Sequence, residues 1–305
     1  MATGWKRIAE ILMARGGGAQ LASRYAGRAS IVLAYHNIVP TGEAACGDLS
    51  LHVDQEVFGQ QLDFLTTLSE VVPLEQAVSR EDSGSRSRLR IAITFDDAYR
   101  GTMTAGVSEL VARSLPATVF VPPGLLGTAG FWWDRLSLPG GGLEPGLRDR
   151  ALLELHGDAD HILAWADIEG RGLVRVPTHA QAVSEAELLN ASLPENILFG
   201  AHTWGHPNLT ALAAERIAEE LVRSKEWLAS RTSRYVNWLA YPYGLQNDAV
   251  VEAAARHFDG ALVVDGGFSE RRGTWSHPVH ATPRLNVPRG LSLEGLALRL
   301  AGLLA

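Results

Sequence analysis

Short apolar runs alternate with longer amphipathic segments along most of the chain. The runs are rich in β-branched residues and end at polar or glycine-rich positions, which predicts buried strands. The longer segments carry apolar residues every three to four positions, which predicts helices. The expected strands are 29–34, 71–72, 91–95, 118–121, 196–201, 236–240 and 261–264. The expected helices are 53–68, 101–114, 147–155, 184–190, 211–228, 249–257 and 293–304, with Thr210 as a candidate cap of the fifth.

The repeated order of strand, helix and strand predicts an α/β fold with parallel strands joined by right-handed crossovers. Periodicity alone does not separate a barrel from a doubly wound sheet. In both architectures the side chains that carry chemistry lie at the carboxyl ends of the strands. Polar residues directly after the predicted strands are therefore the first candidates for a functional site.

Composition narrows the classes of partner. The chain has 305 residues, of which 46% are hydrophobic, so it can bury a large core. Its formal net charge is -7, and Lys6 and Lys225 are its only lysines. We therefore expect neither a nucleic-acid partner nor a polyanionic substrate. Cys46 is the single cysteine, which excludes an internal disulfide and fits a reducing compartment.

The N-terminal segment has apolar residues at positions 5, 8, 11 and 12, which predicts an amphipathic helix. Such a helix would pack on the domain or contact a membrane surface. Glu10 and Arg15 leave too short an apolar stretch for a signal peptide. No stretch approaches the roughly 18 uninterrupted apolar residues that a transmembrane helix needs. We expect a cytoplasmic protein.

Two adjacent carboxylates, Asp96 and Asp97, follow the strand predicted at 91–95. Burial of both without compensation would cost several kcal/mol, so a cation, hydrogen-bond donors or water should lie nearby. His202 and His206 follow another predicted strand, and the glycine and proline beside them favour a turn over a helix. Two imidazoles and one carboxylate are a typical ligand set of a catalytic zinc site.

Several motifs occur in the order known from one family. They are Tyr35-His36-Asn37, Thr94-Phe95-Asp96-Asp97, Pro116-Ala117-Thr118-Val119-Phe120-Val121, His202-Thr203-x-x-His206, Ala240-Tyr241-Pro242-Tyr243-Gly244 and Pro283-Arg284-Leu285-Asn286-Val287. With them the sequence resembles the polysaccharide deacetylase family, carbohydrate esterase 4 with a NodB-homology domain. Within that family it is most similar to the exopolysaccharide N-deacetylase branch. The resemblance covers about 31–290 and is weak at about 127–190.

The resemblance implies a distorted (β/α)7 barrel of the NodB-homology type. It also implies a single catalytic domain at 29–305, preceded by a lead-in at 1–28 and containing an insertion at about 127–190. The implied activity is removal of an N-acetyl group from an N-acetylated sugar in a polysaccharide, oligosaccharide or saccharide precursor.

The resemblance also implies roles for the site residues. Asp97, His202 and His206 would bind a divalent metal ion, with Zn²⁺ expected first and Co²⁺, Ni²⁺, Mn²⁺ or Fe²⁺ as alternatives. Asp96 would be the general base, and the backbone N–H of Tyr243 would share the oxyanion with the ion.

An amide nitrogen must be protonated before the amine can leave, so a general acid is required. The family branch implies His36 for this role. The alternative is His280, with His277 behind it, because the main branch of the family takes its acid from the C-terminal region. Asp265 is a further candidate for orienting the acid through its ring N–H.

The sequence departs from the family pattern at two positions. Ala240 stands where the main branch has an arginine that tethers the catalytic base, and we expect Arg284 to replace that arginine. Ala98 stands where the family usually has glycine, which suggests a slightly altered turn. Two neighbouring aromatic residues, Trp132 and Trp133, either stack on sugar rings or seal the flank of the barrel.

Three alternative functions remain at this stage. The same oxyanion chemistry would serve an O-acetyl esterase acting on carbohydrate. Iron(II) oxygenases also use two histidines and one carboxylate, but on a jelly roll of many short strands, and the α/β pattern argues against them. A carbohydrate-binding protein with an inactive site of the same fold would release no acetate.

Overall fold

The computed structural model describes residues 29–79, 88–190, 193–264, 267–271 and 277–302. The amphipathic helix expected near the N-terminus and the candidate Asp265 lie outside these residues. The domain boundaries therefore stay a prediction.

Seven parallel strands close into a barrel, as the family resemblance implied. Around the ring they are β1 (Ala29–Tyr35), β11 (Thr282–Asn286), β9 (Gly260–Val263), β8 (Tyr235–Ala240), β7 (Ile197–Ala201), β6 (Ala117–Val121) and β5 (Leu89–Phe95). β1 closes the ring because it pairs in parallel with both β11 and β5. Outside the ring, β4 (Ser69–Val71) extends β5, β10 (Glu270–Arg271) runs antiparallel to β1, and β2 (Asn37–Val39) pairs with β3 (His52–Asp54).

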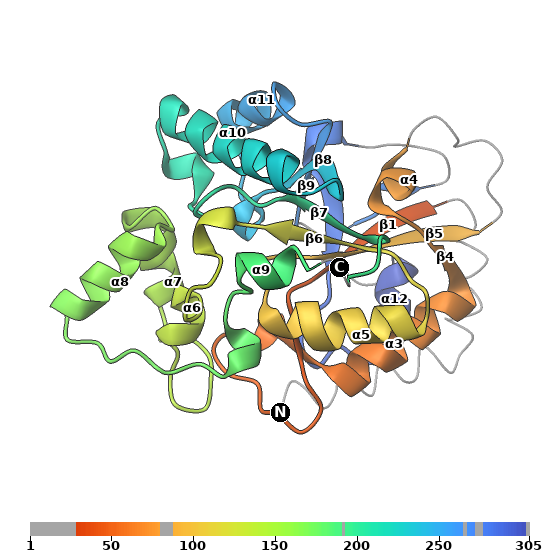
Figure 1. Cartoon of the computed structure of the whole chain (residues 1–305), viewed down its shortest axis with the longest axis horizontal. Coiled ribbons are helices and arrows are strands. Elements are labelled where there is room, and N and C mark those ends of the chain that lie inside the picture. Colours follow the sequence, from red (N-terminus) through yellow and green to blue (C-terminus); the bar gives the residue numbers. More distant parts are fainter. Residues whose placement is uncertain (1–28, 80–87, 191–192, 265–266, 272–276, 303–305) are drawn as a thin grey trace.

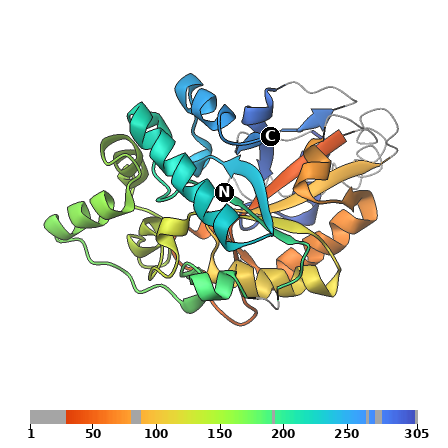
Figure 2. The same cartoon turned by 45° about the horizontal axis from the view of Figure 1, so that its top comes forward.

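Helices surround the barrel (Figures 1 and 2). They are α3 (Gln55–Leu68), α4 (Leu74–Val78), α5 (Val107–Ala112), α10 (Ala214–Arg231), α11 (Asp248–Ala255) and α12 (Leu293–Leu300). The segment 127–190 contributes α6 (Trp132–Arg135), α7 (Leu147–Asp149), α8 (Ala159–Ile168) and α9 (Glu185–Leu188). Short 3₁₀ turns lie at Leu49–Leu51, Pro123–Leu125, Thr178–Ala180, Leu209–Ala211, Pro242–Gly244 and Val279–Ala281, and π-helical turns at Thr102–Gly106 and Arg150–Glu154.

The alternation of side chains along the strands separates two apolar clusters. On β1, Ile31 and Leu33 belong to the cluster that packs against the outer helices, whereas Val32 belongs to the cluster inside the barrel. On β5, Ile93 faces outward and Ala92 inward by the same alternation. This register turns the side chains of Thr94 and Asp96 toward the barrel interior.

The predicted helix boundaries need correction at several places. α10 is preceded by Ala213 at its cap position and not by the expected Thr210, because Thr210 lies in a 3₁₀ turn where its hydroxyl donates to Asn208 at 2.7 Å. The helix expected at 101–114 is split into a π-helical turn and α5. The helix expected at 147–155 is likewise α7 followed by a π-helical turn.

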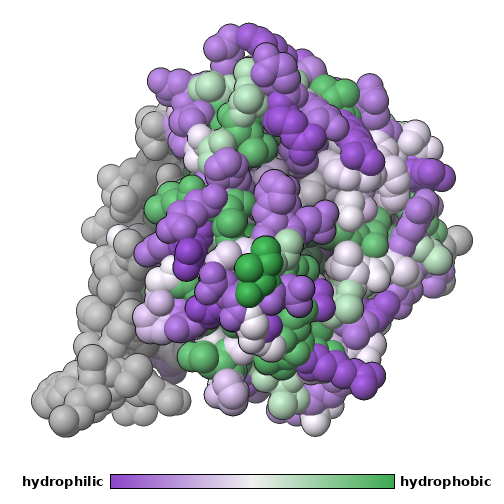
Figure 3. Space-filling view, turned by 90° about the vertical axis from the view of Figure 1, so that its left-hand side faces the viewer, coloured by the Kyte–Doolittle hydropathy of each residue, from purple (hydrophilic) through white to green (hydrophobic). Residues whose placement is uncertain are grey.

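The segment 127–190 builds its own small core, which includes Trp132, Trp133 and Ile162. It also carries most of the large apolar side chains that the described residues expose, namely Leu138, Leu153, Ile168, Leu173 and Val174. Figure 3 views the side of the molecule on which α7 and α8 lie, and apolar patches there are interspersed with polar residues. No helix in the described ranges is both long enough and apolar enough to cross a bilayer.

Candidate active site

The carboxyl ends of the barrel strands bring the predicted site residues together around one cavity of about 420 Å³. His36 follows β1, the two aspartates follow β5, and His202 follows β7. The cavity is lined by His36, Asp48, Ser50, Leu51, Asp96, Asp97, Trp133, Arg148, His202, His206, Tyr243, Gly244, Val264 and Asn286.

Asp97, His202 and His206 form a compact group of potential ligands. Oδ1 of Asp97 lies 3.5 Å from Nε2 of His202 and 3.3 Å from Nε2 of His206. One ligand atom from each of the three residues lies within 4.8 Å of the other two. Oδ1 of Asp97 is buried and has no hydrogen-bond partner in the described part of the chain. A buried carboxylate oxygen without a partner, facing two imidazole nitrogens, fits a bound divalent cation.

The protonation states of the group also suit a cation. Burial lowers the pKa of His202, and burial together with His202 lowers the pKa of His206 to about 3. Both imidazoles are therefore neutral near pH 7 and each can offer a lone pair. His202 donates from Nδ1 to the carbonyl of Ala240 at 2.7 Å, which leaves its Nε2 as the acceptor that faces Asp97.

The two histidines lie on a turn, as the glycine and proline beside them predicted. The carboxylate of Glu220 on α10 accepts hydrogen bonds from the backbone N–H groups of Trp204 and Gly205 at 2.9 and 2.8 Å. The hydroxyl of Thr203 accepts from the N–H of His206 at 3.0 Å. Glu220 is only 6% exposed. Its two hydrogen bonds therefore attach the turn to α10. Glu220 lies in none of the sequence motifs that predicted the site.

Asp96 is held by Arg284, as expected from the missing arginine at Ala240. The guanidinium donates to both carboxylate oxygens at 2.7 Å, and it also donates to the hydroxyl of Thr94 at 3.2 Å. Burial acts to raise the pKa of Asp96, but the charge and the hydrogen bonds of Arg284 act against it, and the pKa lies well below its usual range. Asp96 is thus an ionised carboxylate next to the ligand group.

Backbone strain is concentrated at this site. The structure has seven described non-glycine residues with positive φ. Five of them belong to the site motifs: Asp97, Ala98, Thr203, His206 and Tyr243. Positive φ is unfavourable for residues with a Cβ and persists where the surroundings impose it, often at functional sites. At Ala98 the φ of 54° explains why glycine would suit this position.

The structure separates the two candidates for the general acid. His36 lines the cavity, whereas His280 is absent from its lining and places Nε2 2.9 Å from the carbonyl of Phe258. His277 places its ring nitrogens near the carbonyls of Pro278 and Ser269. Burial lowers the pKa of His36, and the two aspartates act in the opposite direction.

The position of Tyr243 is defined by its neighbours. Its backbone is left-handed, with φ of 59°, and its ring meets the His206 ring edge to face at 4.6 Å. Its hydroxyl accepts a hydrogen bond from the indole of Trp132 at 3.1 Å. Tyr243 is thus a cavity-lining residue whose ring and hydroxyl are both held by neighbouring side chains.

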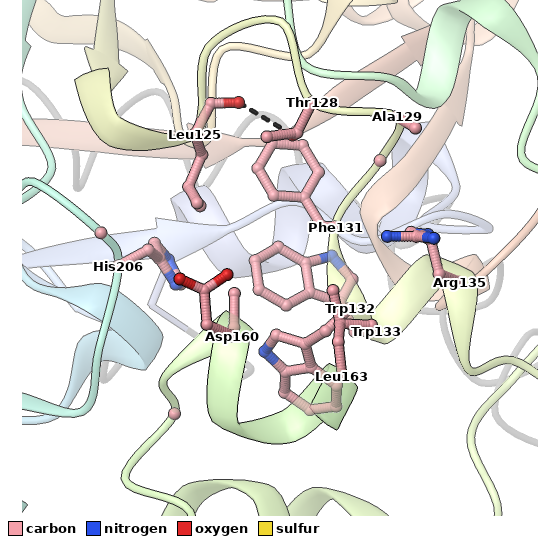
Figure 4. Close-up of a pocket in the computed structure, with 14 residues that line it drawn as sticks. Leu125, Thr128, Ala129, Phe131, Trp132, Trp133, Arg135, Asp160, Leu163 and His206 are labelled. Carbon is pink, nitrogen blue, oxygen red and sulfur yellow. Dashed lines mark hydrogen bonds between the residues drawn. The ribbon is translucent and has the colours of Figure 1, made fainter. Parts of the chain in front are cut away.

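A second cavity, of about 300 Å³, shares Trp133 and His206 with the first. Figure 4 shows aromatic side chains of the α6 region facing it together with Leu163 and Asp160 of α8. Trp132 and Trp133 are only 2% and 4% exposed, so little of either ring is open to a sugar. Their burial favours the flank-sealing alternative.

A group of buried polar residues that the sequence motifs did not predict lies beside the site. Asp134 and His52 form a buried pair at 3.0 Å, and Tyr99 donates to the same carboxylate at 2.8 Å. The only signal in the sequence is an acid placed directly after two tryptophans.

Comparison with known proteins agrees with this fold. The family model of polysaccharide deacetylases matches residues 83–258, which is more than half of the chain. The chain therefore belongs to the polysaccharide deacetylase family, and the resemblance that its motifs suggested is confirmed. Membership supports a deacetylase, a hydrolase that acts on acetylated carbohydrate. No curated protein matches the sequence.

Solved structures share the fold. The Streptococcus pyogenes deacetylase PplD in complex with acetate is 17% identical, with a TM-score of 0.60 over 89% of this chain and 98% of that chain. IcaB from Ammonifex degensii is 17% identical, with a TM-score of 0.59 over 91% and 97%. The deacetylase domain of BpsB from Bordetella bronchiseptica is 18% identical, with a TM-score of 0.55 over 86% and 97%.

Proposed function

We propose that the protein is a metal-dependent hydrolase that removes the N-acetyl group of an N-acetylated saccharide. The observation that carries this proposal is the unpartnered oxygen of Asp97 facing His202 and His206, with the ionised Asp96 alongside. Zn²⁺ is the expected ion, because three nitrogen and oxygen ligands are typical of its catalytic sites. When bound, a divalent ion acts as a Lewis acid on a carbonyl oxygen and makes water more acidic.

Residues of the chain itself carry out the other steps of the proposed hydrolysis. Asp96 accepts the proton of the attacking water. The guanidinium of Arg284 donates to both oxygens of this carboxylate, which keeps it ionised and fixes its orientation. The N–H of Tyr243 donates to the oxyanion that forms on the acetyl group. His36 gives a proton to the nitrogen of the leaving amine. Burial lowers the pKa of His36, and the two aspartates partly offset this shift by favouring the protonated form.

The test of the proposal is release of acetate from a panel of N-acetylated saccharides. Protein treated with a chelator is expected to release none, and addition of Zn²⁺, Co²⁺, Ni²⁺ or Mn²⁺ is expected to restore release. A parallel panel of O-acetylated sugars distinguishes an esterase from an amidase. If no substrate releases acetate with any ion, the proposal fails and a carbohydrate-binding role replaces it.

The role of His36 is tested through the leaving group. In the His36→Ala variant we expect acetate release from an amide to fall about 100-fold, since an amine leaves only when protonated. Hydrolysis of an activated aryl acetate should change little, because a phenolate leaves without a proton. The His280→Ala variant should match the wild type on both substrates. A selective loss on amides in His280→Ala instead would transfer the role to His280.

A further inference from the structure

The two histidines of the ligand group are held in different ways. His202 donates from Nδ1 to the carbonyl of Ala240. Nδ1 of His206 is buried and has no hydrogen-bond partner in the described ranges. Histidines that bind metals nearly always donate their second ring N–H to an acceptor, which fixes the orientation of the ring. Some other contact must therefore orient His206.

Aromatic rings supply that contact. The centroid of the Trp133 indole lies 5.1 Å from that of His206, and the centroid of Tyr243 lies 4.6 Å from it. Trp133 and Tyr243 also meet each other nearly perpendicularly at 6.1 Å. Contacts of this kind depend on ring geometry and restrict the rotation of the ring that they enclose.

Hydrogen bonds fix the indole in turn. An indole N–H can only donate, so Nε1 of Trp133 donates to the hydroxyl of Tyr99 at 2.7 Å. The hydroxyl donates its own proton to Oδ2 of Asp134 at 2.8 Å. Trp133, Tyr99 and Asp134 are all at least 96% buried, so no exposed water competes for these bonds.

Asp134 is itself fixed from the other side. The amide Nδ2 of Asn37 lies 2.9 Å from Nδ1 of both His52 and His179, so it donates one proton to each. Both imidazoles then carry their proton on Nε2. His52 donates it to Oδ1 of Asp134 at 3.0 Å, and His179 donates its proton to the carbonyl of Ala44 at 3.1 Å. With this assignment each of these bonds joins one donor to one acceptor.

We propose that Trp133 is a positioning residue that orients the His206 imidazole toward the cation, in place of a hydrogen bond to Nδ1, and that Tyr99 and Asp134 hold the indole there. This inference rests on the proposed metal-dependent function. It assigns a role to the buried polar group beside the site, which the proposed chemistry does not use.

The experiment measures affinity for Zn²⁺ and Co²⁺ by chelator competition, the absorption spectrum of the Co²⁺-loaded protein, and the Tm of the metal-free protein. Trp133→Leu should weaken metal affinity about tenfold or more, as loss of an orienting neighbour of a ligand commonly does. It should also change the Co²⁺ spectrum. Trp133→Phe keeps a ring beside His206, so it should recover part of the affinity.

Tyr99→Phe tests the hydrogen bonds alone, because it removes one hydroxyl and leaves the ring. It should weaken affinity less than Trp133→Leu and to about the same extent as Trp133→Phe. The matched controls are Trp165→Leu on α8 and Tyr235→Phe on β8, neither of which lines the cavity. Both should bind metal within about twofold of the wild type.

The outcomes separate the inference from the function on which it rests. If Trp133→Leu and Trp133→Phe bind both ions as tightly as the wild type, the inference is wrong and the metal site stands. If the affinity of every Trp133 variant falls only together with the Tm of the metal-free protein, the tryptophan is merely structural and the inference is also overturned. A wild-type protein that binds neither ion overturns the inference and the proposed metal dependence together.

Discussion

Replacing Asp96 by asparagine is expected to lower turnover about 10³-fold while the metal content of the protein stays unchanged. Asparagine has the same shape but cannot accept the proton of the attacking water. Because Asp96 is bound by Arg284 and not counted among the ligand group, the ion should remain. The measurement is kcat for acetate release at saturating metal, with the bound metal quantified in the same sample.

The control for this variant is Asp167→Asn, a neutralised aspartate that is exposed on α8 and lines neither cavity. Its turnover should match that of the wild type. Turnover of Asp96→Asn within about tenfold of the wild type would show that another group accepts the proton. Loss of the metal from Asp96→Asn would instead place this carboxylate among the ligands.

Replacing Arg284 by methionine is expected to lower both stability and turnover. The residue is fully buried, and its removal leaves the Asp96 carboxylate without its cation. Loss of one partner of a buried pair costs about 3–5 kcal/mol of unfolding free energy. Turnover should fall at least about tenfold, because the base loses two charged hydrogen bonds that fix its direction. Denaturant unfolding and acetate release measure the two effects.

A matched control exists on the surface. Arg289 pairs with Asp54 at 3.2 Å, with both side chains about one-third or more exposed, so Arg289→Met should cost less than about 1 kcal/mol. Arg284→Lys restores the positive charge but not the paired N–H donors of the guanidinium, so it should recover only part of the turnover. Near-normal turnover of Arg284→Met would remove Arg284 from the proposed mechanism.

The sequence predicted the strands well because each is a short apolar run that ends at a polar motif. Six of the seven barrel strands were expected within about two residues of their observed bounds. The contact between Arg284 and Asp96 could be anticipated only through the family pattern. Its physical basis is the register of β11, β1 and β5, which turns both side chains into the barrel interior, and this register depends on closure of the ring.

The segment 127–190 could not be predicted in the same way. α6 has four residues, which is too short to show a helical period, although helices were expected at 147–155 and 184–190, where α7 with its π-helical turn and α9 lie. α8 buries only Ile162 and Ala166, so its apolar stripe is weak, and its start depends on the cap that Asp158 provides to two N–H groups. The positioning role of Trp133 was equally hidden, because its partners come from distant parts of the sequence.

The closure of the ring has a consequence for dissecting this protein. The region that the family model covers, 83–258, contains all three proposed metal ligands but neither β1 nor β11. Arg284 lies on β11, and His36 directly follows β1. The two strands pair with each other although they are distant in sequence. The minimal unit that could perform the complete proposed reaction is thus larger than the region that the family model covers, and it must also include β1 with His36 and β11 with Arg284.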